Sequence, residues 1–141
     1  MSDLENAVSG AACENAIEVK NLTKKYDGFT LDDISFAVPR GSIMGFIGQN
    51  GAGKSTTIKA ILNIIKTDGG QIRLLGMDHI KDEKKVKEQI AAVFDECPFH
   101  DSFKAKQLSI MFQGIYETWD EKLFYQYMDR FGLPRNKKIG K

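Results

Sequence analysis

Residues 48–56 read Gly48-Gln49-Asn50-Gly51-Ala52-Gly53-Lys54-Ser55-Thr56 and directly follow the apolar run Ile43-Met44-Gly45-Phe46-Ile47. Their spacing matches G-x-x-x-x-G-K-[ST], the pattern of a phosphate-binding loop. Glycines let backbone N–H groups approach phosphate oxygens without a Cβ in the way, and the lysine adds a compact cation. The sequence therefore predicts that residues 48–56 bind a nucleoside triphosphate, with the Ser55 hydroxyl offered to Mg²⁺.

The residues on either side of this loop fit the same prediction. The run 43–47 predicts a buried strand that leads into the loop. Residues 54–65 contain neither Gly nor Pro and predict a helix. The N-terminal end of such a helix carries a partial positive charge, which favours phosphate.

Composition excludes several classes of protein. Twenty basic and nineteen acidic residues leave a net charge of +1, so nothing global indicates a nucleic-acid or anionic-membrane partner. Two cysteines stand far apart, which implies neither a disulfide framework nor a metal site, and a reducing cytosolic compartment fits best. No apolar run approaches the roughly 20 residues that a membrane helix requires.

The region before residue 98 predicts a mixture of strands and helices. Residues 16–38 predict two strands joined by a turn at Tyr26-Asp27-Gly28, and residues 71–75 predict a further short strand. Residues 82–89 predict a charged helix. The apolar run 90–94 predicts a parallel strand that ends at Asp95-Glu96.

Beyond Pro98 the pattern changes to amphipathic helices. One apolar stripe runs from Leu108 to Trp119 and a second from Leu123 to Phe131, and both stripes are predicted to be core. Thr118 with Glu121 predicts a capping box at the start of the second helix. The predicted organisation is a disordered tail at 1–15, a phosphate-loop core at 16–97 and the start of a helical region at 98–141.

A longer stretch, Leu31–Thr56, closely resembles the N-terminal portion of ABC transporter ATP-binding subunits. Asp68–Ile72 with Gly76 resembles the strand and turn that follow the first helix of that family. The resemblance runs from about residue 16 to the end. It implies an α/β fold: a P-loop NTPase core with an N-terminal antiparallel β subdomain and the start of an α-helical subdomain, truncated.

The resemblance also implies roles for single residues. The cofactors would be ATP and Mg²⁺, with Lys54 on the β- and γ-phosphates and Tyr26 stacking on adenine. The family usually has a glutamine at the position of Asp95, in a loop that reaches Mg²⁺. Here we expect Asp95, rather than Glu96, to serve as a catalytic metal ligand.

Several motifs of the family are not found in the sequence. It contains no Leu-Ser-Gly-Gly-Gln segment, no Walker B strand far downstream and no switch histidine. The resemblance therefore implies the N-terminal half of a nucleotide-binding domain, which binds ATP without hydrolysing it. Its implied partners are transmembrane permease subunits and a second nucleotide-binding subunit, with no nucleic acid. The implied location is cytoplasmic, peripheral to the inner face of the cell membrane.

Two other interpretations stay open. The chain could be a self-sufficient small P-loop NTPase or kinase in which Asp95-Glu96 is the Walker B pair, although only about forty residues separate this pair from Lys54. It could also be a catalytically silent docking partner. The transported substrate would be chosen mostly by membrane subunits, so the sequence does not predict it.

Overall fold

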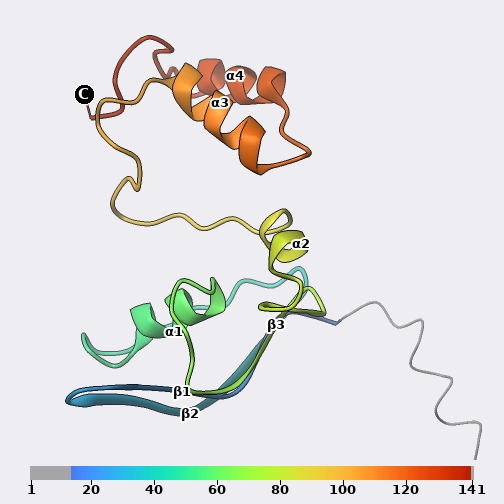
Figure 1. Cartoon of the computed structure of the whole chain (residues 1–141), viewed down its shortest axis with the longest axis vertical. Coiled ribbons are helices and arrows are strands. Elements are labelled where there is room, and N and C mark those ends of the chain that lie inside the picture. Colours follow the sequence, from blue (N-terminus) through green and yellow to red (C-terminus); the bar gives the residue numbers. More distant parts are fainter. Residues whose placement is uncertain (1–13, 141) are drawn as a thin grey trace, which may run out of the picture. The chain divides into compact units, whose positions relative to one another are not determined.

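The computed structural model describes residues 14–140, which form two compact units that divide between Lys87 and Glu88 (Figure 1). The predicted disordered tail, residues 1–15, therefore lies almost wholly outside the described part of the chain. The sequence placed the start of the helical region at residue 98, whereas the second compact unit starts earlier, at Glu88.

An antiparallel sheet is the frame of the first unit. Its strands are β1 (Asn15–Tyr26), β2 (Phe29–Pro39), β3 (Gly69–Leu74) and β4 (Met77–Asp78), in the order β2-β1-β3-β4. The β1–β2 hairpin turns at Asp27-Gly28, where Gly28 has a φ of 82°, so that Tyr26 pairs with Phe29. The predicted N-terminal antiparallel β subdomain is confirmed.

Two polar residues in left-handed conformation bend this hairpin. Asn21 and Asp33 each have a φ of 50°, which Asn and Asp tolerate better than most residues. The Asn21 side-chain amide donates to Asp33 Oδ1 at 2.6 Å, and the Asn21 backbone N–H donates to Ser35 Oγ at 2.8 Å. The β1–β2 register shifts on both sides of Leu22. Such bulges increase the local twist and curve the strand pair.

Helix α1 (Lys54–Ile61) lies over this sheet, as Figure 1 shows. It buries Thr57 and Ala60, and Thr57 Oγ1 donates to the Gly53 carbonyl at 2.8 Å. The helix stops before the predicted limit at residue 65, because Asn63 adopts a φ of 54° that a right-handed helix cannot contain. The short helix α2 (Glu83–Lys87) follows β4 and matches the predicted charged helix.

The core of the first unit is small and is built mainly by the sheet. Each of its larger aliphatic side chains stabilises the fold by roughly 1.5–3 kcal/mol when it leaves water. The buried apolar residues of the unit are Val19, Leu22, Leu31, Ala60, Ile72, Leu74 and Val86.

Two predicted strands are wrong. Residues 43–47 and 90–94 have no regular secondary structure. The exposed fraction of the side chain is 102% for Ile43, 95% for Ile47 and 97% for Val93. A strand needs a neighbour that pairs with its N–H and C=O groups, and within residues 14–140 neither segment has one.

The segment before the loop is nevertheless held on one side. Met44 and Phe46 are each 40% exposed, much less than Ile43 and Ile47. The Phe46 ring lies 5.4 Å from the Phe36 ring of β2, centroid to centroid. Alternate side chains therefore contact the first unit while those between them face solvent.

The second unit contains the two predicted amphipathic helices, α3 (Ala105–Ile115) and α4 (Glu121–Arg130). The buried Ser109 hydroxyl links them, because it accepts a hydrogen bond from Trp119 Nε1 at 3.1 Å and donates to Glu121 Oε1 at 3.2 Å. The residue that caps α4 is Asp120, whose Oδ1 accepts from the Leu123 N–H at 2.9 Å. The predicted capping box on Thr118 is therefore wrong.

The predicted core stripes are wrong as well. No residue of α4 is buried, and α3 buries only Ala105 and Ser109. The two helices pack along a narrow seam, which leaves much of both apolar faces in water. Exposed apolar residues of these stripes are Ile115, Leu123, Tyr127 and Phe131. Among residues 14–140, no helix combines the length and apolar character needed to cross a membrane.

Asp68 joins the end of β1 to the start of β3. Its Oδ2 accepts from the Lys25 backbone N–H at 2.7 Å and lies 3.5 Å from Lys24 Nζ, while the Asp68 N–H donates to the Thr23 carbonyl at 2.9 Å. The hydrogen bond from the Lys25 backbone, and then the Lys24 ammonium, hold the pKa of Asp68 below its ordinary value.

We expect Asp68→Asn to destabilise the chain near neutral pH and to lose this effect in acid. Because the folded pKa lies below the unfolded value of about 3.9, the contribution of Asp68 is complete above that value and is lost as the pH falls through the folded pKa. Urea unfolding from about pH 7 to about pH 3 measures it, with Asp32→Asn on the exposed face of β2 as the control. A stability difference that does not change with pH would contradict the assignment.

Gly70 lies where β3 meets the bulged part of β1, with a φ of 93°. A Cβ at this position would lie 2.5 Å from the Asn21 carbonyl oxygen and 2.6 Å from the Lys20 carbonyl oxygen. Gly28 has a similar φ of 82°, but nothing lies within 4 Å of a Cβ built there. The pair therefore separates backbone strain from steric overlap.

Gly70→Ala should lower the free energy of unfolding by roughly 2–5 kcal/mol, since left-handed strain costs about 1–2 kcal/mol and overpacking about 1–3 kcal/mol. Gly28→Ala should lose only the strain, about 1–2 kcal/mol. Urea unfolding followed by circular dichroism compares the two variants. Equal losses would show that the contact between β3 and β1 is not tight.

Candidate functional site

The loop 48–56 leads directly into α1 and turns on two glycines. Gly51 has a φ of 84° and Gly53 a φ of 96°, both in the region that disfavours other residues. A Cβ on Gly53 would lie 2.6 Å from Leu31 Cδ1 and 3.2 Å from Phe29 Cζ. Position 53 therefore needs a glycine for two reasons: its backbone is left-handed, and the side chains of β2 lie too close for a Cβ.

Gly53 is also the N-cap of α1, and no side chain caps this end of the helix. The first-turn N–H groups of a helix have no partner within it, and with the helix dipole they attract anions. The first turn of α1 contains no acidic residue that would oppose an anion. The end of the helix thus has the donors and the polarity of a phosphate site.

The Lys54 ammonium lies within the loop. Lys54 Nζ donates to the carbonyl oxygens of Gly48 and Gln49, the latter at 2.9 Å. The Ala52 N–H donates to the same Gln49 carbonyl at 3.1 Å, which closes the turn. The charge of Lys54 is consequently held beside the N-terminus of α1.

These groups surround a cavity of about 360 Å³. It brings together most of the predicted loop ligands, while Gly48 and Ala52 belong to the loop without lining the cavity. The sequence prediction missed Phe29, because only the packing of β2 against Gly53 places this ring at the loop. The lining residues are Phe29, Gln49, Asn50, Gly51, Gly53, Lys54, Ser55 and Thr56.

Two other predicted site residues are not among those that line this cavity. Tyr26, at the end of β1, is 45% exposed and does not line this cavity; Lys24 Nζ lies 5.3 Å from the centre of its ring. Asp95 is exposed and belongs to the second unit. Within residues 14–140 no group of three or more His, Cys, Asp or Glu side chains is arranged to hold a metal ion. Adenine stacking by Tyr26 and Mg²⁺ ligation by Asp95 stay predictions.

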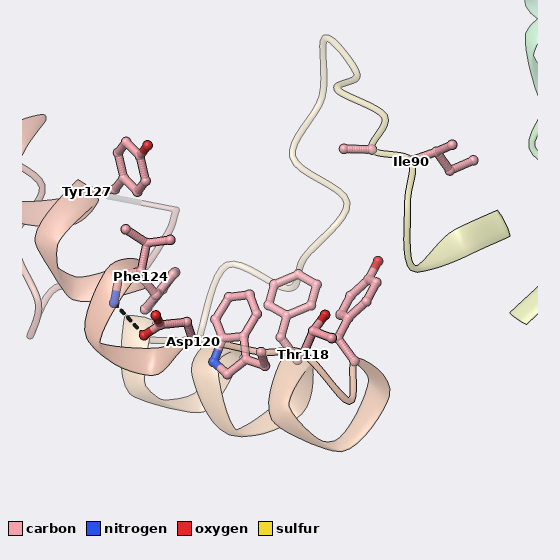
Figure 2. Close-up of a pocket in the computed structure, with 10 residues that line it drawn as sticks. Ile90, Thr118, Asp120, Phe124 and Tyr127 are labelled. Carbon is pink, nitrogen blue, oxygen red and sulfur yellow. Dashed lines mark hydrogen bonds between the residues drawn. The ribbon is translucent and has the colours of Figure 1, made fainter. Parts of the chain in front are cut away.

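A second cavity, of about 470 Å³, lies in the second unit (Figure 2). Thr118, Asp120, Phe124 and Tyr127 contribute from α4 and the turn before it, and Ile90 from the start of the unit. Its walls are largely aromatic and contain no cation; Phe112 and Trp119 stack there at 5.1 Å between ring centroids. This chemistry does not suit a phosphate. The loop cavity is the candidate nucleotide site because of its own lining, which includes the Lys54 ammonium and the uncapped start of α1.

Comparisons with known proteins point to one family. The family model described as ABC transporter matches residues 31–141. The ABC transporter ATP-binding protein YtrB of Bacillus subtilis is 37% identical over 123 residues, which cover 86% of this chain and 42% of that protein. The probable multidrug ABC transporter ATP-binding protein YbhF of Escherichia coli is 36% identical over 112 residues, or 79% of this chain and 19% of that protein.

The fold has solved counterparts as well. A structure described as the ATP binding subunit of an ABC transporter superposes with a TM-score of 0.74 at 25% identity and covers 87% of this chain. This chain covers 54% of that structure. The chain thus spans less than half of the length of the curated relatives and about half of the solved one.

Proposed function

The chain belongs to the ABC transporter family, and on this premise we propose that it is the part of a transport ATPase that binds Mg·ATP through residues 48–56. The observation that carries the proposal is the loop itself. Its glycines expose backbone N–H groups at the uncapped N-terminus of α1, and Lys54 adds its ammonium there. This combination binds a polyphosphate with charge-assisted hydrogen bonds.

Lys54 would take the β- and γ-phosphates. Its ammonium now donates to the Gly48 and Gln49 carbonyls, so it already lies among the loop residues that would surround the phosphates. Phosphate oxygens are stronger acceptors than neutral carbonyls, because they carry charge. The nucleotide would therefore draw Lys54 away from the loop carbonyls.

Mg²⁺ would be held by oxygen ligands, the first of them Ser55. The Ser55 hydroxyl fits this role because it lies in the first turn of α1 and lines the same cavity as Lys54. Asp95 is the proposed second ligand, in place of the family's usual glutamine. Bound Mg²⁺ would supply positive charge against the phosphates, while Lys54 and the loop N–H groups orient them.

Tyr26 would stack on adenine. Its half-exposed ring at the tip of the β1–β2 hairpin leaves aromatic surface in contact with solvent. Aromatic faces cover a base at little entropic cost. The position ahead of the loop is the one that the family uses for this contact.

The whole protein would power transport through transmembrane permease subunits and would work with a second nucleotide-binding subunit. It would lie in the cytoplasm, peripheral to the inner face of the membrane. The names of the relatives support this proposal, because YtrB and YbhF are ATP-binding proteins of ABC transporters.

We expect Lys54→Ala to weaken Mg·ATP binding by about 10- to 100-fold, the cost of removing one or two charge-assisted hydrogen bonds. Titration calorimetry measures the affinity, and circular dichroism checks that the fold is retained. Lys59→Ala removes the same charge from the other end of α1 and should leave the affinity nearly unchanged. Equal affinities for the wild type and Lys54→Ala would overturn the assignment of the loop.

The 141 residues alone should bind ATP without turnover. Hydrolysis needs a positioned water and charge stabilisation, and the sequence contains no Leu-Ser-Gly-Gly-Gln segment to supply the family's contacts to a partner's nucleotide. We expect no phosphate release above background with Mg·ATP. Turnover that is lost in Glu96→Gln would favour the self-sufficient NTPase instead.

A further inference from the structure

Phe29 is a residue of the loop cavity that the phosphate-loop pattern does not contain. Within the described part of the chain, it is the one lining residue that comes from outside residues 49–56. It begins β2 and is half-buried. The cavity is therefore formed by the loop together with the tip of the β1–β2 hairpin.

The Phe29 ring is held at this place by its neighbours. Its Cζ lies 3.2 Å from where a Cβ of Gly53 would be, so the ring rests against the backbone at the start of α1. Leu31 contacts the same glycine and is 4% exposed. Across the hairpin Phe29 pairs with Tyr26. A ring fixed in this way presents a preformed apolar wall and loses little entropy when a ligand binds.

The chemistry of the wall indicates which part of a ligand it meets. The loop side of the cavity offers backbone N–H groups, the Lys54 ammonium and the hydroxyls of Ser55 and Thr56, all of which suit phosphate oxygens. The phenyl ring offers no hydrogen bond and would desolvate a phosphate without compensation. It suits the C–H and π surfaces of a sugar or a base.

We propose that Phe29 contacts the nucleoside part of the bound nucleotide, as a second aromatic residue in addition to Tyr26. This inference rests on the proposed function of the loop. The two rings have different settings: Phe29 lines the cavity, whereas Tyr26 lies outside its lining and has Lys24 Nζ 5.3 Å from its ring centre. Phe29 therefore contributes to nucleotide affinity independently of any stacking by Tyr26.

The test compares a ligand that has a nucleoside with one that does not. Binding of Mg·ATP and of Mg·tripolyphosphate is measured by titration calorimetry for the wild type, Phe29→Ala and Phe29→Leu. Phe29→Ala should weaken the binding of Mg·ATP by about 3- to 10-fold, which is the range of a single aromatic contact. It should weaken the binding of Mg·tripolyphosphate by less than about 2-fold. Phe29→Leu keeps apolar bulk beside Gly53 without the flat ring and should restore only part of the ATP affinity. Phe131→Ala, the same truncation in the second unit, should change neither.

Each other result has a definite meaning. If Phe29→Ala weakens both ligands equally, the ring acts only through Gly53 and the proposed contact is wrong. If it weakens neither, Phe29 has no part in binding. In both cases the assignment of the loop as the phosphate site stands if Lys54→Ala still weakens the binding of Mg·tripolyphosphate. A wild type that binds neither ligand overturns the proposed function and this inference together.

Discussion

The close approach of β2 to the backbone of Gly53 is the constraint on which the candidate site depends. Leu31 and Phe29 occupy the space that any side chain at position 53 would need. Because Gly53 has no Cβ, it fits against these side chains and adopts its left-handed conformation. It begins α1 and leaves the first turn of the helix without a side-chain cap. The absence of a Cβ at position 53 thus lets the β1–β2 hairpin, the start of α1 and the candidate site lie together.

That approach requires the hairpin to curve and to stay attached to the rest of the sheet. The hydrogen bond between Asn21 and Asp33 fixes the bulges that bend it. Gly70 lets β3 pass close to the carbonyl oxygens of β1, and Asp68 ties the end of β1 to β3. These contacts are local and individually modest, since a net hydrogen bond contributes about 0.5–1.5 kcal/mol. Together they decide where Phe29 meets the loop.

What the sequence predicted correctly depends on near neighbours in the chain. The turn at Asp27-Gly28 and the glycines of the loop need particular backbone angles, and their residue types reveal this directly. Residues 43–47 and 90–94 have apolar patterns typical of strands, but a strand exists only with a partner, which a pattern does not contain.

Side-chain roles were harder to predict than elements. Thr118 and Asp120 are both good capping residues close to α4, and the pattern alone does not choose between them. Apolar spacing predicted both helices of the second unit but not how little of each is buried. Phe29 was missed because its role arises from a contact with Gly53, which is far away in the sequence.

The uneven exposure of residues 43–47 has a consequence for handling the chain. One side of this segment contacts Phe36, while Ile43 and Ile47 remain in water. The segment has no charge and no proline, the composition of short stretches that self-associate into cross-β aggregates. Pro39 and Arg40, shortly before it, are the kind of gatekeeper residues that hinder such stacking. We therefore expect residues 43–47 to be a segment through which copies of the chain self-associate.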